Sequence, residues 1–185
     1  MLPYKPLLAS VAASAALLAA TALTGAASAQ TSARSGTGKP TARERALLDS
    51  HELWATIDVC SPAKQPNTVG VRGSMPGDGH AHDRMYMSFR LQYLNASEQW
   101  VDLPSGASAG WVAVGDGASP RQSGSSFELK PVAGKPAVTL RGVVDFQWRR
   151  GKTVLLSAAQ PTTVGHRSLA GAEPADYSAA TCVIG

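Results

Sequence analysis

Two segments of the chain alternate between apolar and polar residues, the pattern of a strand with one buried and one solvated face. In residues 84–93 the apolar positions are Met85, Met87, Phe89, Leu91 and Tyr93. In residues 138–149 they are Val138, Leu140, Val144, Phe146 and Trp148. The second segment leads through a turn containing Gly151 into another apolar run at 152–158, which indicates a β-hairpin. We therefore expect both segments to line the core of an antiparallel sheet.

Further short runs rich in β-branched and aromatic residues are separated by turns of Gly, Pro, Asp and Ser. They lie at 53–60, 66–73, 110–115, 126–130 and 177–185. Because no long amphipathic helix pattern interrupts them, the runs are typical of two packed antiparallel sheets. We predict an all-β fold for residues 51–185, an antiparallel immunoglobulin-like sandwich of about seven to eight strands.

The chain before the sandwich has a different composition. Residues 30–40 are small and polar, with little that can pack, which predicts a flexible linker. Thr41 and Glu44 have the spacing of a capping box, and the Ala, Leu and Arg that follow favour a helix over about 42–49. Residues 30–50 are therefore interpreted as a linker and a short helix.

The first 29 residues resemble a secretory signal. An uncharged apolar run from Leu7 to Leu23 follows Lys5, and Ala27-Ser28-Ala29 places small residues where a signal peptidase reads them. The run is about 17 residues long, whereas a membrane-spanning helix needs about 20 strongly apolar residues. We predict a signal peptide at 1–29, a mature N-terminus at Gln30, and a secreted or extracytoplasmic protein without a membrane span after cleavage. The alternative is an uncleaved N-terminal anchor.

The overall charge is low. Charged residues make up 16% of the chain and the net charge is +4, whereas charged residues typically make up about 25%. This composition does not favour a nucleic-acid-binding protein. The abundance of Ala, Gly and Arg is typical of a GC-rich bacterium.

The chain has two cysteines, Cys60 and Cys182. In an oxidising compartment such a pair predicts one disulfide, here between an early and a late strand. Closing a loop of about 120 residues stabilises the fold by up to about 4–5 kcal/mol in chain-entropy models. The alternative is a metal-ligating or reactive pair, although neither cysteine lies in a CxxC motif.

A Gly-rich segment between Met75 and Met87 concentrates histidines, methionines and acids. Imidazole suits copper and zinc, and thioether sulfur favours Cu(I). The segment therefore carries a candidate Cu or Zn site at His80, His82 and Asp83, and no other cofactor is expected. The alternative places the two histidines in an exposed flexible turn and the methionines in the core.

Gly106 to Gly110 matches the G-x-S-x-G pattern of hydrolases, with Ser108 at its centre and Asp145 and His166 later in the chain. The motif functions at a strand-to-helix elbow, whereas here a predicted strand follows it. We expect a flexible loop and no catalytic site, and hence a protein that is not an enzyme.

The polar faces of the two alternating segments carry arginines: Arg84 and Arg90 on the first, Arg141 and Arg149 on the second. If the strands are neighbours, these arginines form a cationic patch that attracts anionic envelope polymers or a partner protein. Trp100, in the predicted loop 97–104, is the best candidate for an exposed platform for sugars. The alternative is a solvated face balanced by acids, namely Asp102, Glu128 and Asp145.

Residues 53–185, with their short strands and their cysteine pair, resemble small secreted bacterial immunoglobulin-like β-sandwich proteins of uncharacterised function. The likeness implies an architecture and no activity, and the Cys–Trp–Cys spacing of antibody domains is absent. We expect a secreted, non-catalytic domain with a binding or structural role at the cell envelope and an envelope or extracellular partner. The alternative is an extracytoplasmic Cu- or Zn-binding protein that uses the His80/His82 loop.

Overall fold

The structure is a computed structural model that describes residues 39–104, 108–166 and 169–185. The predicted signal peptide, its cleavage site and the linker up to residue 38 lie outside the described residues. Among the described residues, no helix has the length and apolar character needed to cross a membrane.

One short helix and nine strands make up the described parts of the chain, with all the strands antiparallel to their sheet neighbours. The elements are α1 (Ala42–Leu48), β1 (Trp54–Cys60), β2 (Thr68–Met75), β3 (His80–Leu94), β4 (Trp100–Asp102), β5 (Ser108–Gly117), β6 (Arg121–Glu128), β7 (Val138–Arg150), β8 (Thr153–Pro161) and β9 (Cys182–Ile184). The predicted capping box is confirmed, since Thr41 and Glu44 exchange hydrogen bonds at the start of α1.

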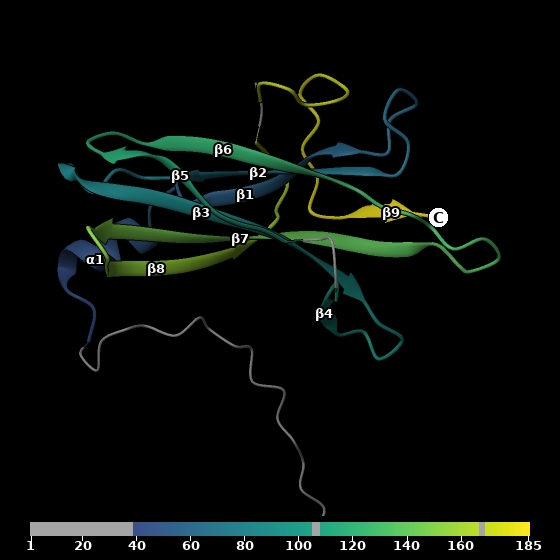
Figure 1. Ribbon diagram of the computed structural model, residues 1–185, viewed down its shortest axis with the longest axis horizontal. Coiled ribbons are helices and arrows are strands. Elements are labelled where there is room, and N and C mark those ends of the chain that lie inside the picture. The colour runs from purple at the N-terminus through teal and green to yellow at the C-terminus, as the bar shows by residue number, and fades with distance from the viewer. Residues whose placement is uncertain (1–38, 105–107, 167–168) are drawn as a thin grey trace, which may run out of the picture.

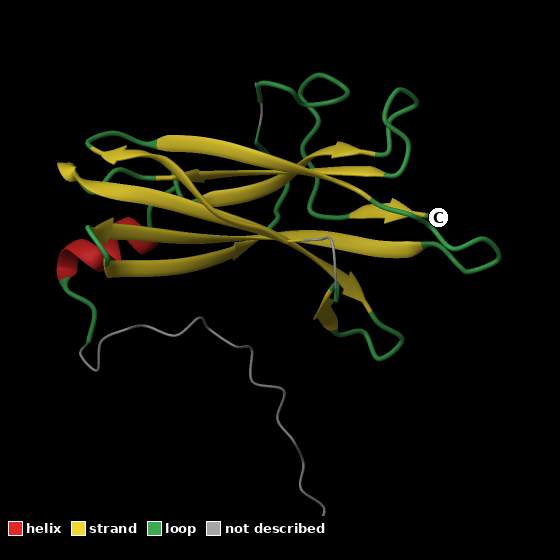
Figure 2. Ribbon diagram, in the orientation of Figure 1, coloured by secondary structure: helices red, strands yellow, loops and turns green. Residues whose placement is uncertain are grey.

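The strands form two sheets that pack face to face (Figures 1 and 2). The three-stranded sheet has the order β1-β2-β6. In the six-stranded sheet β3 and β7 are central, with β4 and β5 along the outer edge of β3 and β8 and β9 along the outer edge of β7. The predicted all-β sandwich is confirmed, whereas its immunoglobulin-like character stays a prediction.

The inner face of the β3–β7 pair supplies much of the core, as the alternation predicted. Met85, Met87 and Phe89 are fully buried, as are Val144 and Phe146 across the pair. At position 142 a side chain is excluded, because a Cβ on Gly142 would lie 2.7 Å from both methyl carbons of Val71 in the opposite sheet. The two sheets approach each other closely at this glycine.

Trp148 is also buried, as predicted, and its indole nitrogen donates a hydrogen bond to the carbonyl oxygen of Pro76 at 3.0 Å. Val138, which the alternation assigned to the buried face, is 39% exposed because it lies at the far end of β7, where only the short strand β9 pairs with it. The prediction was wrong at this strand end.

The predicted strand 177–185 is much shorter in the structure, where it is reduced to β9. The preceding residues run instead along the outer edge of β1, where Ile57 and Ala179 exchange backbone hydrogen bonds of 2.9 and 3.0 Å. Because this segment covers β1, the strand is buried on both faces over Ala55–Val59. The sequence also gave no signal for β4, which is only three residues long.

The predicted disulfide between Cys60 and Cys182 is confirmed, with the Cα atoms 5.6 Å apart. Cys60 ends β1 in the three-stranded sheet, and Cys182 begins β9 in the six-stranded sheet. The bond therefore joins the two layers of the sandwich as well as the early and late parts of the chain.

Candidate functional site

All four predicted arginines lie on the outer face of the six-stranded sheet. The pairing of β3 with β7 sets Arg84 opposite Arg149 and Gln92 opposite Arg141. Aromatic side chains from β3, β4 and β5 lie among them. We call this set the arginine–aromatic face, and it consists of Arg84, Arg90, Arg141, Arg149, Tyr86, Trp100 and Trp111.

Arg90 is held by two carboxylates. Its Nε donates to Asp145 Oδ2 at 3.0 Å and its Nη1 to Asp102 Oδ1 at 2.6 Å. Burial opposes the charge on Arg90, but the hydrogen bonds and charges of the two acids outweigh it and raise its pKa above the ordinary value. Two of the three predicted balancing acids therefore lie on this face, whereas Glu128 ends β6 in the other sheet.

Arg141 is positioned by an aromatic ring and an amide. Its guanidinium lies 4.5 Å from the ring centroid of Trp100, and its Nε donates to Gln92 Oε1 at 2.8 Å. Burial, together with the nearby charge of Arg90, lowers the pKa of Arg141. The prediction of Trp100 as an exposed loop platform was wrong. Trp100 is the first residue of β4, its side chain is half-buried, and the guanidinium of Arg141 lies over its ring.

Arg149 lies beside two aromatic rings, with its guanidinium 4.2 Å from the centroid of Tyr86 and 5.0 Å from that of Trp111. Its Nε donates to Gln147 Oε1 at 2.7 Å. Trp111 remains 43% exposed. The alternation that puts Arg84 and Arg90 on one face also predicts Tyr86 there, whereas sequence reasoning did not assign Trp111 to this surface. Across the described part of the chain, neither Arg149 nor Arg141 forms an ion pair with a carboxylate.

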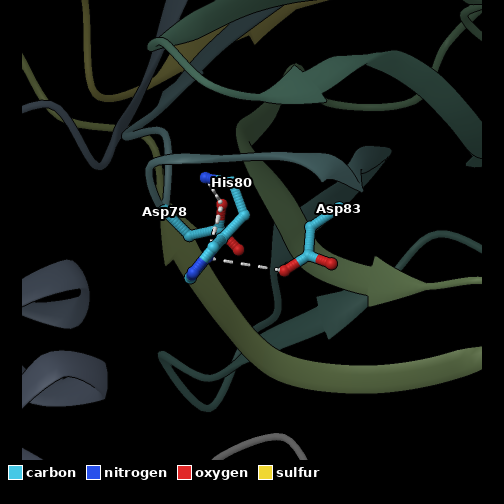
Figure 3. Close-up of side chains that lie close together, drawn as sticks. All are labelled: Asp78, His80 and Asp83. Carbon is cyan, nitrogen blue, oxygen red and sulfur yellow. Dashed lines mark hydrogen bonds and ion pairs between the residues drawn. The ribbon is translucent and has the colours of Figure 1, made fainter.

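A second group of polar side chains lies at the end of the sandwich next to α1: Asp78, His80 and Asp83 (Figure 3). His80 and His82 were expected in a loop, but both belong to β3. The pairing of β3 with β5 shifts register between His80 and Arg84, so that strict alternation is broken there. The side chain of His80 therefore lies on the same side of β3 as that of Asp83. His82 is exposed and lies outside the group.

One nitrogen of His80 is close to both acids. His80 Nδ1 lies 3.8 Å from Asp78 Oδ1 and 3.8 Å from Asp83 Oδ2. Asp78 Oδ1 also accepts the backbone N–H of His80 at 2.9 Å. Asp83 is fully buried and accepts two hydrogen bonds from Arg150, at 2.7 and 2.8 Å.

The two acids experience different environments. Burial, reinforced by neighbouring Asp83, raises the pKa of Asp78 above the ordinary value of an aspartate. The hydrogen bonds from Arg150 outweigh burial and lower the pKa of Asp83. The pair thus contains one carboxylate stabilised by an arginine and one carboxyl that ionises less readily.

A cavity of about 130 Å³ adjoins these acids, and α1 and Trp148 form other parts of its wall. Arg43 of α1 donates to the carbonyl oxygen of Asp78, and its Nη2 lies 3.2 Å from His80 Nδ1. A Cβ at Gly117 would collide with Asp78 Oδ1, so this glycine leaves space for the carboxyl group. The methionines do not contribute, because Met75, Met85 and Met87 are in the core, as one of the two sequence interpretations expected.

The residues of the hydrolase-like motif are held by other partners. Ser108 begins β5, and the preceding Gly106 and Ala107 lie outside the described residues. Asp145 binds Arg90 on the arginine–aromatic face. His166 stacks on Trp54 of β1 with ring centroids 4.1 Å apart, and burial lowers its pKa.

Comparisons with family models, with curated proteins and with solved structures gave no match to this chain. The functional argument therefore rests on the residues and their geometry.

Proposed function

We propose that the protein is a secreted, non-catalytic binding domain whose arginine–aromatic face binds an extended anionic polymer at the cell envelope. The observation that carries this proposal is the state of Arg141 and Arg149. Each guanidinium is held over an aromatic ring, and neither forms an ion pair with a carboxylate among the described residues. Both are positioned charges that an anionic group can approach from solvent.

The spacing of the two arginines favours a long ligand. They are eight positions apart on one strand, so they point to the same side, about 26 Å from each other at strand rise. A small anion would reach one of them, whereas a polymer can lie along the sheet and contact both.

The charge distribution favours an anionic ligand. Arg84 lies directly opposite Arg149 on β7, and like charges in facing positions of a sheet repel each other; Asp116 of β5, which faces Arg84 from the other side, balances part of this repulsion. An anion bound between them would relieve that repulsion. Because the rings already hold Arg141 and Arg149 in place, with a contribution of about 0.5–1 kcal/mol for an exposed cation–π pair, binding loses little side-chain entropy.

An extracytoplasmic location is part of the proposal. The disulfide between Cys60 and Cys182 supports it, since such bonds persist in oxidising compartments. The predicted signal peptide points to the same location.

The test is the affinity for polygalacturonate, an anionic polysaccharide, compared with uncharged dextran, measured by calorimetry at low salt. The unmodified protein should bind polygalacturonate and not dextran, and added salt should weaken the binding because exposed charges are screened. The double variant Arg141→Gln/Arg149→Gln should bind roughly tenfold or more weakly, because it loses two charge-assisted contacts.

The matched control is Lys64→Gln/Lys130→Gln, which removes the same charge from loops beside the three-stranded sheet. It should bind nearly as the unmodified protein does. Equal weakening in the control would show a non-specific charge effect and would contradict the proposed face. Equal binding of dextran would show recognition of sugar rings rather than of anionic groups.

A further inference from the structure

We propose that Asp78, His80 and Asp83 bind one Zn²⁺ ion at the end of the sandwich covered by α1. The site is separate from the arginine–aromatic face and does not depend on polymer binding. It also differs from the site expected from the sequence, because Asp78 takes the place of His82.

The ligand atoms are already close to the geometry that zinc requires. Zinc binds nitrogen and oxygen at about 2.0–2.2 Å, so two ligands of a tetrahedral ion are about 3.3 Å apart. His80 Nδ1 is 3.8 Å from an oxygen of each aspartate, and all three atoms lie within 4.8 Å of one another. Each His80–aspartate distance is therefore about half an ångström longer than in a zinc site, and small side-chain movements would bring the three ligands together.

The two acidic ligands are oriented by neighbouring groups. Arg150 holds Asp83 through two hydrogen bonds, and the backbone N–H of His80 holds Asp78. Partners of this kind are typical of the outer shell of a metal site, where they fix the direction of the ligands. Both carboxyl groups are buried, with 1% and 8% of the side chain exposed, so water competes weakly for them.

The chemistry of the ligand atoms favours Zn²⁺ over Cu(I). Imidazole and carboxylate suit Zn²⁺, whereas Cu(I) prefers sulfur. The methionines of the segment are fully buried in the core, and both cysteines are in the disulfide. The adjoining cavity of about 130 Å³ has room for water as a fourth ligand, given about 30 Å³ for each water molecule.

Arg43 places a positive charge against the ring of His80. Its Nη1 is 3.4 Å from Nε2 and its Nη2 is 3.2 Å from Nδ1, so its charge opposes that of a bound metal ion. Arg43 is an exposed residue of a seven-residue helix, which is held to the sandwich by Leu47 and Leu48 packing against the core. The metal should therefore bind more tightly when Arg43 is removed, which a merely structural cluster would not predict.

The experiment is a calorimetric titration of the purified protein with ZnCl₂, with the stoichiometry checked by native mass spectrometry. One ion should bind per chain. His80→Ala should lower the affinity by roughly tenfold or more, because even outer-shell partners are worth about 10–100-fold. The matched control His82→Ala should bind within about twofold of the unmodified protein, and Arg43→Ala should bind more tightly than the unmodified protein.

Asp78→Asn serves as the second ligand variant, because a change at Asp83 would also remove both hydrogen bonds from Arg150. Its thermal midpoint should stay near that of the unmodified protein while its zinc affinity falls. Absence of a stoichiometric zinc adduct overturns the proposal, as does equal loss of affinity in His80→Ala and His82→Ala. Failure of Arg43→Ala to tighten binding overturns the opposing effect of the Arg43 charge. Polymer binding is measured in a separate experiment, so a failure to bind polymer would not change the interpretation of the zinc titration.

Discussion

The two faces of strand β3 come from alternate residues of one segment, yet different forces fix their side chains. On the inner face Met85, Met87 and Phe89 are fully buried, and close packing fixes their positions. On the outer face Tyr86 and Arg90 are fixed by contacts with individual charged side chains from β7 and β4. A face built from pairwise polar contacts remains accessible to solvent, and so it can exchange some of them for a ligand.

Asp83 is an exception to this division of β3 into an apolar inner face and a polar outer face. By alternation it continues the inner face, but it is a charged residue at 0% exposure. The inner face tolerates it at the strand end because Arg150 satisfies both of its oxygens. Chemistry at this end of the sandwich therefore depends on buried carboxyl groups, whereas the arginine–aromatic face depends on partly exposed guanidinium groups.

The largest expected effect concerns the disulfide between Cys60 and Cys182, which joins the two sheets. Reduction of Cys60–Cys182 should lower the free energy of unfolding by up to about 4–5 kcal/mol, because the reduced unfolded chain regains loop entropy. Urea denaturation of the oxidised and reduced protein measures it, with a thiol assay as the control for redox state. An unchanged unfolding midpoint would show that packing alone holds the layers together.

The next effect compares the two faces directly. Phe89→Ala should lower the free energy of unfolding by about 3–5 kcal/mol, because it leaves a cavity in the core. Tyr86→Ala, three residues away on the outer face, should lower it by about 1 kcal/mol or less, because it removes a partly exposed ring and one cation–π contact. Chemical denaturation of both variants measures the difference. Similar losses would mean that the outer face is packed as tightly as the inner one.

The smallest effect concerns His166, whose ring is only partly withdrawn from water. Burial lowers its pKa, so the unfolded chain, with an ordinary histidine value of about 6.5, binds a proton more readily than the folded protein. This contribution to stability is present above that value and is lost as the pH falls below it. His166→Phe retains a ring against Trp54 and should reduce the loss of stability between about pH 7.5 and about pH 5.5. Identical pH profiles for both proteins would assign the dependence to other groups.

Much of the fold could be predicted from the sequence where the alternation is long. The residues 84–93 and 138–149 were assigned to the correct strands and, apart from Val138, to the correct faces, since one-sided burial leaves a period-2 pattern. The four arginines of the candidate face followed from the same pattern. Short or irregular elements were missed, because β4 is too short to show a period and the region before β9 pairs through isolated bridges.

The group formed by Asp78, His80 and Asp83 shows where sequence reasoning fails for single residues. The spacing His80-x-His82 in a Gly-rich segment suggested that both rings could lie on one side of an ion. In the structure both belong to β3, and the shift in register before Arg84 breaks the strand alternation, brings His80 to Asp83 and leaves His82 outside the group. Asp78 and Arg43 join them from the β2–β3 turn and from α1.

The sequence by itself determined the class of fold, the buried and solvated faces of the long strands, the capped helix and the cysteine pair. Each is encoded by local periodicity, local hydrogen bonding or residue type. The tertiary structure decided which strands are neighbours, where the bulge in β3 lies and which side chains meet, including Arg141 over Trp100 and Arg43 beside His80. These depend on contacts between residues far apart in the chain, and no local pattern specifies them.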